Sequence, residues 1–168
     1  MTGGCSGSSP APTATSPGHT GTTPSVTPSA TPTVAASSPT GPPQLTPTLD
    51  LSAYAFAGVK SPSGHIGCLF QNSPASVRCD VDNAHWNVAT PANCHLGYGD
   101  SAEVGQRTAD LGCHGDTVIG SVPRQPVLPY GQTVRYKNLL CTSATTGMTC
   151  RNPAGHGFTV ARASYRLF

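Results

Sequence analysis

Residues 65–81, HIGCLFQNSPASVRCDV, decide the fold of this chain because they predict a β-hairpin with a cysteine on each arm. HIGCLF and SVRCDV are short strand-like runs, and the turn-forming cluster QNSPA separates them. A hairpin centred between Ser73 and Pro74 places Cys68 directly opposite Cys79. Side chains that face each other in this way are close enough for a disulfide.

A second stretch, residues 138–152, repeats the arrangement. NLLCTSATTGMTCRN places Cys141 and Cys150 on either side of a Thr/Gly turn. Of the cysteines beyond residue 67, only Cys94 and Cys113 are then left, and we expect them to pair. The local pattern therefore predicts the disulfides Cys68–Cys79, Cys94–Cys113 and Cys141–Cys150.

The cysteine spacing also indicates a compartment. The sequence contains no C-x-x-C pair, so the usual zinc-ribbon and thioredoxin spacings are missing. An even set of cysteines without metal spacing in a small domain is typical of disulfides, which form in oxidising surroundings. The alternative is a cytosolic protein with free, buried thiols.

The remaining sequence predicts an all-β fold, a small antiparallel sandwich or barrel cross-linked by three disulfides. Short strand-like runs recur between Gly, Pro, Asn and Asp at roughly ten-residue spacing, as in such folds. They are YAFAGVK (54–60), HIGCLF (65–70), SVRCDV (76–81), DTVIGSV (116–122), QTVRYK (132–137), NLLCT (138–142) and GFTVARASYRLF (157–168). The last run changes its alternation near Arg162, which predicts a bend or bulge there. A short helix is expected within residues 99–110, although Gly105 weakens it.

The N-terminal part of the chain has a different composition. Residues 1–49 contain no Asp, Glu, Lys or Arg, and residues 6–49 are almost wholly Ser, Thr, Pro, Ala and Gly. Such a segment cannot bury enough apolar surface to offset the entropy of ordering it. We expect a disordered tether over 6–49, either O-glycosylated or unmodified, and a disulfide-bonded domain over 50–168.

Several motifs resemble a known family. SPSGHIGC, VRCDV, a following Trp and above all GMTCRNPAGHGFTVARASYRLF are similar to small exported proteins of actinobacteria, especially mycobacteria, many of them lipoproteins. The resemblance covers about residues 56–168 and all six domain cysteines. It implies export and a disulfide-linked β domain of unknown function, with no catalytic residues to transfer.

Lipoproteins of this kind carry a lipobox, and Gly3, Gly4 and Cys5 fit its last three positions. Residues 1–5 would then be the remnant of a signal peptide, and Cys5 the acylated residue that anchors the chain to the membrane. Thr2 departs from the usual Leu, and no apolar region precedes it, so either the start is assigned too late or the signal sequence was removed. The alternative is an accidental free thiol on a cytosolic tail.

Candidate chemistry is sparse. The serine-hydrolase elbow, the zinc-protease motif, the phosphate loop and the dinucleotide fingerprint are all missing from the sequence. His114 and Asp116 in CHGD would need a serine to form a hydrolase triad, and His85 and His95 with them would form a zinc site. His156 in GHGF is expected in a tight turn, with its ring bonded to the backbone. Trp86 is expected to close one end of the core beneath a loop, with sugar stacking as the alternative.

The basic residues allow two interpretations. Arg151, Arg162 and Arg166, with Arg135 and Lys137, would form a cationic face for acidic glycans or lipid headgroups; alternatively they pair with Asp80, Asp82 and Asp110 on a solvated sheet. The formal charge of +2 gives no case for nucleic acid.

We therefore expect an exported lipoprotein, anchored through Cys5 to the outer face of the cell membrane, with a shed or secreted form as a variant. It would use no cofactor or metal. Its role would be a non-catalytic binding or structural one in the cell envelope, with an envelope glycan or protein as ligand. The alternative is a secreted hydrolase that acts on envelope material.

Overall fold

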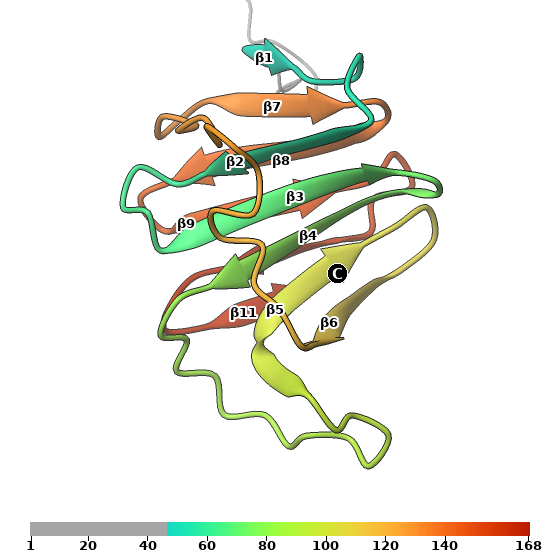
Figure 1. Ribbon diagram of the computed structural model, residues 1–168, viewed down its shortest axis with the longest axis vertical. Coiled ribbons are helices and arrows are strands. Elements are labelled where there is room, and N and C mark those ends of the chain that lie inside the picture. The colour runs from blue at the N-terminus through green and yellow to red at the C-terminus, as the bar shows by residue number, and fades with distance from the viewer. Residues whose placement is uncertain (1–46) are drawn as a thin grey trace, which may run out of the picture. The chain divides into compact units, whose positions relative to one another are not determined.

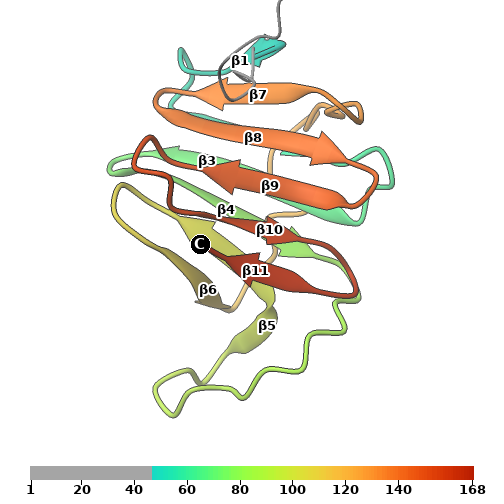
Figure 2. The ribbon, with the colours of Figure 1, turned by 180° about the vertical axis from the view of Figure 1, so that it is seen from behind.

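The computed structural model describes residues 47–168. Cys5 and the greater part of the predicted tether lie outside the described residues. Within 47–168 the chain is all-β and forms two sheets, so the predicted fold class is confirmed, and the sandwich is the form that it takes (Figures 1 and 2). The described residues contain no helix that is long and apolar enough to cross a membrane.

The first sheet, sheet A, has the strand order β1-β7-β8-β9-β10-β11. The second, sheet B, has the order β2-β3-β4-β5-β6. Neighbouring strands are antiparallel except for the short parallel pair β1–β7. The strands of sheet A are β1 (Leu49–Asp50), β7 (Thr133–Tyr136), β8 (Leu139–Ala144), β9 (Gly147–Arg151), β10 (Gly157–Val160) and β11 (Tyr165–Leu167). Those of sheet B are β2 (Phe56–Lys60), β3 (Ile66–Asn72), β4 (Ala75–Val81), β5 (Gly97–Val104) and β6 (Ala109–His114).

The core lies between the two sheets, because alternate residues of each strand point inward. Phe70 of β3 stacks on Tyr136 of β7, with 5.2 Å between the ring centroids. Val77, Met148 and Phe158 are fully buried around them. Trp86 packs against this core while partly buried, and its ring lies 5.0 Å from that of Tyr165.

Each sheet contains a disulfide between two neighbouring strands, and a third disulfide joins the segment after β4 to β6. The structure joins Cys68 to Cys79, Cys94 to Cys113 and Cys141 to Cys150, the three pairs that the spacing predicts. The β3–β4 register also agrees with the predicted hairpin, since Cys68 lies opposite Cys79 and Asn72 opposite Ala75. Two disulfides meet at the centre of the sandwich, where 3.6 Å separate the Sγ atoms of Cys79 and Cys150.

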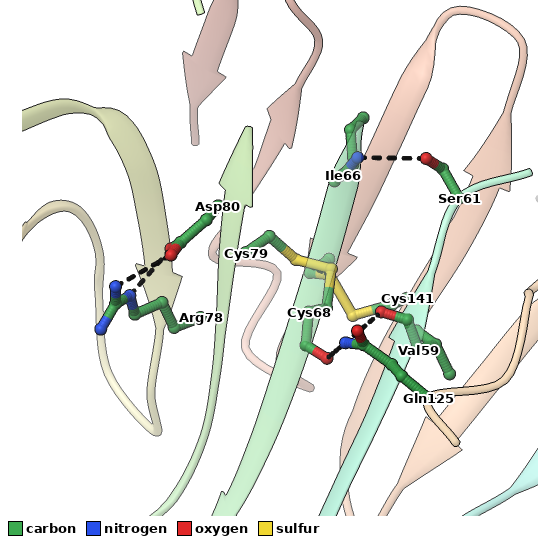
Figure 3. Close-up of a disulfide and its surroundings, with 10 residues drawn as sticks. Val59, Ser61, Ile66, Cys68, Arg78, Cys79, Asp80, Gln125 and Cys141 are labelled. Atoms are coloured by element: carbon green, nitrogen blue, oxygen red, sulfur yellow. Dashed lines mark hydrogen bonds and ion pairs between the residues drawn. A yellow bond between two sulfur atoms is a disulfide. The ribbon is translucent and has the colours of Figure 1, made fainter. Parts of the chain in front are cut away.

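A long connection leads from sheet B to sheet A. Residues 115–132, which we call the strap, cross the outer face of sheet B between β6 and β7 (Figure 1). Gln125 anchors the strap, since its Nε2 donates to the backbone oxygens of Val59 (3.0 Å) and Cys68 (3.1 Å) (Figure 3). Gly67 makes room for it, because a Cβ atom there would lie 2.9 Å from Cα of Ile119.

Three expectations about local structure are wrong. The predicted strand DTVIGSV is part of the strap, because side chains bind its backbone donors: Val118 N donates to Asp80 Oδ2 (2.8 Å) and Gly120 N to Gln125 Oε1 (3.0 Å). The final run is also not one strand but two, β10 and β11. The bend expected near Arg162 is present, as a turn over 161–164 closed by reciprocal backbone hydrogen bonds between Ala161 and Ser164.

The predicted helix in 99–110 is also wrong, since these residues form the β5–β6 hairpin. Ala102 and Val104 both point into the core, opposite Cys79 and Val77 of β4. This alternation with period two suits a strand, and the pairing with β4 overrides the local helix propensity.

Candidate functional site

His114 and Asp116 do lie together, at the start of the strap. Nε2 of His114 is 2.7 Å from Oδ1 of Asp100, and its Nδ1 is 2.6 Å from the backbone oxygen of Asp116. The Asp116 carboxylate accepts a hydrogen bond from Arg78 (3.0 Å), and this bond, with the Arg78 charge, lowers the pKa of Asp116. Both ring nitrogens of His114 are therefore engaged, and within the described residues neither contacts a serine.

Arg78 makes this cluster a structural anchor. Its guanidinium binds Asp80 through two hydrogen bonds of 2.8 and 2.9 Å and also binds the backbone oxygen of Asp116 (2.7 Å). Asp80 is buried and also accepts Val118 N, so one ion network joins β4 to the strap. These contacts hold the start of the strap against β4. This structural role accounts for the cluster without a catalytic one.

The other predicted site residues are separate from this cluster. His156 is exposed in a turn that contains Gly155 at φ +90°, and its backbone N donates to Oδ1 of Asn152 (3.1 Å). The expected bond from its ring to the backbone is not among the hydrogen bonds of this turn. Trp86 is half-buried, and its Nε1 donates to the backbone oxygen of Ala161 (2.7 Å).

The predicted zinc ligands are not assembled in the described part of the chain. His85 and His95 are both exposed, and neither joins His114 in a group of three metal-ligating side chains. The group that does form among residues 47–168 is Cys68, Cys79 and Cys150, whose sulfurs are already in disulfides.

A groove with aromatic and proline walls lies at the edge of sheet B. Its exposed aromatic rings are Tyr54 and Phe56, with relative exposures of 59% and 67%. The groove has a volume of about 520 Å³, and the strap forms its second wall with Pro123, Arg124 and Pro126. Sequence analysis missed this site because its two walls lie some seventy residues apart. The one local signal is the pair of aromatic residues two positions apart in YAFAG.

Both walls of the groove are held in place. The hydroxyl of Tyr136 donates to the backbone oxygens of Tyr54 (2.9 Å) and Ala55 (3.0 Å), which fixes the segment that carries the aromatic rings. On the other side, Gln125 ties the strap to sheet B beside Arg124. A surface that is ordered before binding loses less conformational entropy when a ligand binds.

The basic residues predicted to form a cationic face lie in a different sheet from the aspartates that were their predicted partners. Arg135, Arg151 and Arg166 belong to strands of sheet A, whereas Asp80 and Asp110 belong to strands of sheet B and Asp82 follows β4. Asp80 binds Arg78, and Asp82 lies 3.2 Å from Nδ1 of His65. The expected pairing of the basic residues with these three aspartates is therefore wrong.

Comparison with known proteins places the whole sandwich in one family. Residues 48–168 match the model of a family of unknown function, DUF6636. The chain belongs to the DUF6636 family. No curated protein and no solved structure matches this DUF6636 chain. The family match begins one residue before β1 and includes the strap, the groove and all three disulfides.

Proposed function

We propose that this chain is an exported, lipid-anchored module that binds a glycan of the cell envelope without chemical turnover. The observation that carries the proposal is the pre-formed groove with Tyr54 and Phe56 exposed on one wall. Exposed aromatic rings on a fixed backbone offer apolar faces to a sugar ring, and Arg124 adds a hydrogen-bond donor beside them.

Export and anchoring are part of the same proposal. Three disulfides fit an exported protein, because such bonds persist in oxidising compartments. Anchoring is supported by Cys5, which has no partner in the predicted disulfide set and precedes a long uncharged segment. A diacylglycerol and an N-acyl chain on Cys5 would give stable attachment, where a single chain would be marginal.

The hydrolase alternative lacks a geometric basis in the described residues. A hydrolase of the serine type needs a histidine that contacts both a serine and a carboxylate. His114 contacts Asp100 and the backbone of Asp116, and His156 lies exposed in a turn. We therefore propose binding and not hydrolysis.

Binding is tested by pull-down of the full chain on insoluble cell-wall glycan at about 300 mM salt, where charge interactions are largely screened. We expect Tyr54→Ser with Phe56→Ser to abolish retention, because the apolar wall of the groove is lost. Tyr130→Ser is the matched control, since Tyr130 is also exposed (43%) but lies outside the groove. Equal retention of the groove variant would refute this site, and retention only in the presence of other envelope proteins would indicate a protein ligand.

Anchoring has its own test. The chain is expressed from its native gene in cells fed a clickable palmitate analogue. We expect label in the wild type and none in Cys5→Ser, which would also shift from the membrane fraction to the soluble exported fraction. Label that persists in Cys5→Ser would refute acylation at this residue.

A further inference from the structure

The two parts of the described chain that contain sheet A and sheet B carry opposite net formal charges. Residues 133–168, together with β1, hold five basic residues and one acidic residue: Arg135, Lys137, Arg151, Arg162, Arg166 and Asp50. Residues 51–132 hold four basic and six acidic residues: Lys60, Arg78, Arg107, Arg124, Asp80, Asp82, Asp100, Glu103, Asp110 and Asp116. The formal charge of +2 is therefore the sum of +4 in residues 133–168 with β1 and −2 in residues 51–132.

The strand arginines of sheet A, Arg135, Arg151 and Arg166, point to its outer face. Buried residues such as Val134, Cys141 and Phe158 define the inner face, so their strand neighbours point outward. Among residues 47–168 no other segment crosses strands β8 to β11 on this face (Figure 2), whereas the strap covers the outer face of sheet B. Thr133 of β7, in contrast, is buried.

A row of hydroxyl groups runs across this face, perpendicular to the strands. The register aligns four threonines and one arginine on adjacent strands: Thr133, Thr142, Thr149, Thr159 and Arg166. Thr133 bonds Thr142 and Thr149 bonds Thr159, each at 2.9 Å between Oγ1 atoms. Thr133 is buried, so the accessible part of the row is the half-buried set Thr142, Thr149 and Thr159. The Thr149–Thr159 pair uses one hydroxyl hydrogen, so it still offers a donor and free lone pairs.

Arginines flank the row. In a neighbouring row Arg135, Leu140 and Arg151 lie on adjacent strands. Arg135 binds Asp50, but among the described residues Arg151 and Arg166 form no ion pair. The guanidinium of Arg166 lies over the Phe168 ring, 5.7 Å from its centroid, and Arg151 borders a depression of about 320 Å³.

We infer that the outer face of sheet A is a second binding surface and that its ligand is an acidic polysaccharide. Arg151 and Arg166 supply planar donors that match carboxylate or phosphate groups. The threonine row supplies hydroxyls that can bond the sugar hydroxyls of a linear polymer. A row of hydroxyls fits a polar polymer better than a membrane, because surfaces that enter a membrane interface carry bulky apolar side chains.

This inference is independent of the Tyr54–Phe56 groove, which lies on sheet B. The test uses the full chain with Cys5→Ser, so that intermolecular disulfides do not make it multivalent. Binding to polygalacturonate is measured by biolayer interferometry at about 50 mM and about 300 mM salt, where charge interactions are screened to different extents. Dextran is the uncharged comparison, and vesicles that contain phosphatidylglycerol are the lipid comparison.

We expect polygalacturonate to bind at low salt and dextran to bind much more weakly. Arg151→Gln with Arg166→Gln should lower the affinity about tenfold or more, as loss of both charge contacts would. Thr149→Val with Thr159→Val should lower it by a smaller factor, at unchanged net charge.

The control is Lys60→Gln with Arg107→Gln, which removes the same charge from the sheet B side of the molecule and should change the affinity less than about twofold. An equal loss in this control would show a non-specific charge effect and overturn the inference. Absence of polygalacturonate binding, or binding only to the vesicles, would overturn it as well. Since groove variants should bind polygalacturonate normally, failure of either proposal is recognised separately.

Discussion

Asp50 is a single exposed carboxylate whose neighbours strongly favour its ionised form. Its Oδ1 accepts the backbone N–H of Ser52 (2.9 Å), and its Oδ2 accepts Nε of Arg135 (3.0 Å). Hydrogen bonds from Ser52, followed by those from Arg135, lower the pKa of Asp50 from 3.8 to about 2. The residue thus helps to fix the short β1 strand against β7.

The titration of Asp50 is the first prediction. Because its pKa is lower in the folded state than the 3.8 of the free side chain, its contribution to stability is present above about pH 4 and is lost as the pH falls to about 2. We expect an NMR titration to show a midpoint near 2 for the Asp50 carboxyl. Ser52→Ala and Arg135→Gln should each raise that midpoint toward 3.8, whereas the distant Arg107→Gln should leave it unchanged. A midpoint near the free value in the wild type would contradict the hydrogen bonds described for Asp50.

Individual residues also show why the groove was not predicted from sequence. Tyr54 and Phe56 are aromatic residues of the kind that is typical of strands. The residues next to them in sequence do not indicate that their rings stay exposed. Their place in a groove follows from Pro123 and Pro126, which the strap brings opposite them from a distant part of the chain. His114 and Asp116 were predicted to be close because they are neighbours in sequence, but their partners Asp100 and Arg78 were not.

At the scale of elements, the strap depends on the absence of side chains beneath it. A Cβ atom on Gly67 would lie 2.9 Å from Cα of Ile119, and that backbone cannot yield as a flexible side chain would. A Cβ atom on Gly105, in contrast, would have no neighbour within 4 Å, and Gly105 has no positive φ. The two glycines form a matched pair for mutation.

We predict that Gly67→Ala lowers the free energy of unfolding by about 1–3 kcal/mol, as overpacking does. Gly105→Ala should change it by less than about 0.5 kcal/mol. Urea denaturation checks both values, and hydrogen exchange at Val118 and Gly120 should accelerate only in Gly67→Ala. If the two variants were equally stable, close contact between the strap and sheet B would be disproved.

Elements differed in how well the sequence predicted them. The β3–β4 and β8–β9 hairpins were predicted with their cysteine pairs, because turn residues and paired cysteines are local signals. The β5–β6 hairpin was predicted as a helix, since its strand identity comes from pairing with β4. Residues 116–122 of the strap were predicted as a strand, because the side chains that bind this backbone, Asp80 and Gln125, are not recognisable as its partners in sequence.

For the molecule as a whole, the disulfides divide into two classes by burial. Cys68, Cys79, Cys141 and Cys150 are fully buried between the sheets. The third disulfide joins the segment after β4 to β6 and has one buried half, Cys94, and one exposed half, Cys113. A reductant reaches exposed sulfur directly but reaches the central sulfurs only after the sheets separate.

We predict that mild reduction opens Cys94–Cys113 first, as measured by alkylation and mass spectrometry. Its loss should lower the free energy of unfolding by about 3 kcal/mol, the value that the chain-entropy model gives for a loop of this size. In guanidinium chloride all three disulfides should be reduced together, which controls for intrinsic reactivity. Earlier reduction of Cys68–Cys79 in the native protein would contradict the buried position of that bond.

The contact between the two central disulfides has a further consequence, for thiol exchange. If the Cys68–Cys79 bond is cut, the thiolate of Cys79 lies against Sγ of Cys150, which is 3.6 Å away in the intact protein. Its attack there would form a Cys79–Cys150 bond and release the thiolate of Cys141. Because Cys79 belongs to sheet B and Cys150 to sheet A, this exchange would convert a link within one sheet into a covalent bond between the two. Partial reduction would then rearrange the covalent connectivity of the sandwich while still holding its two layers together.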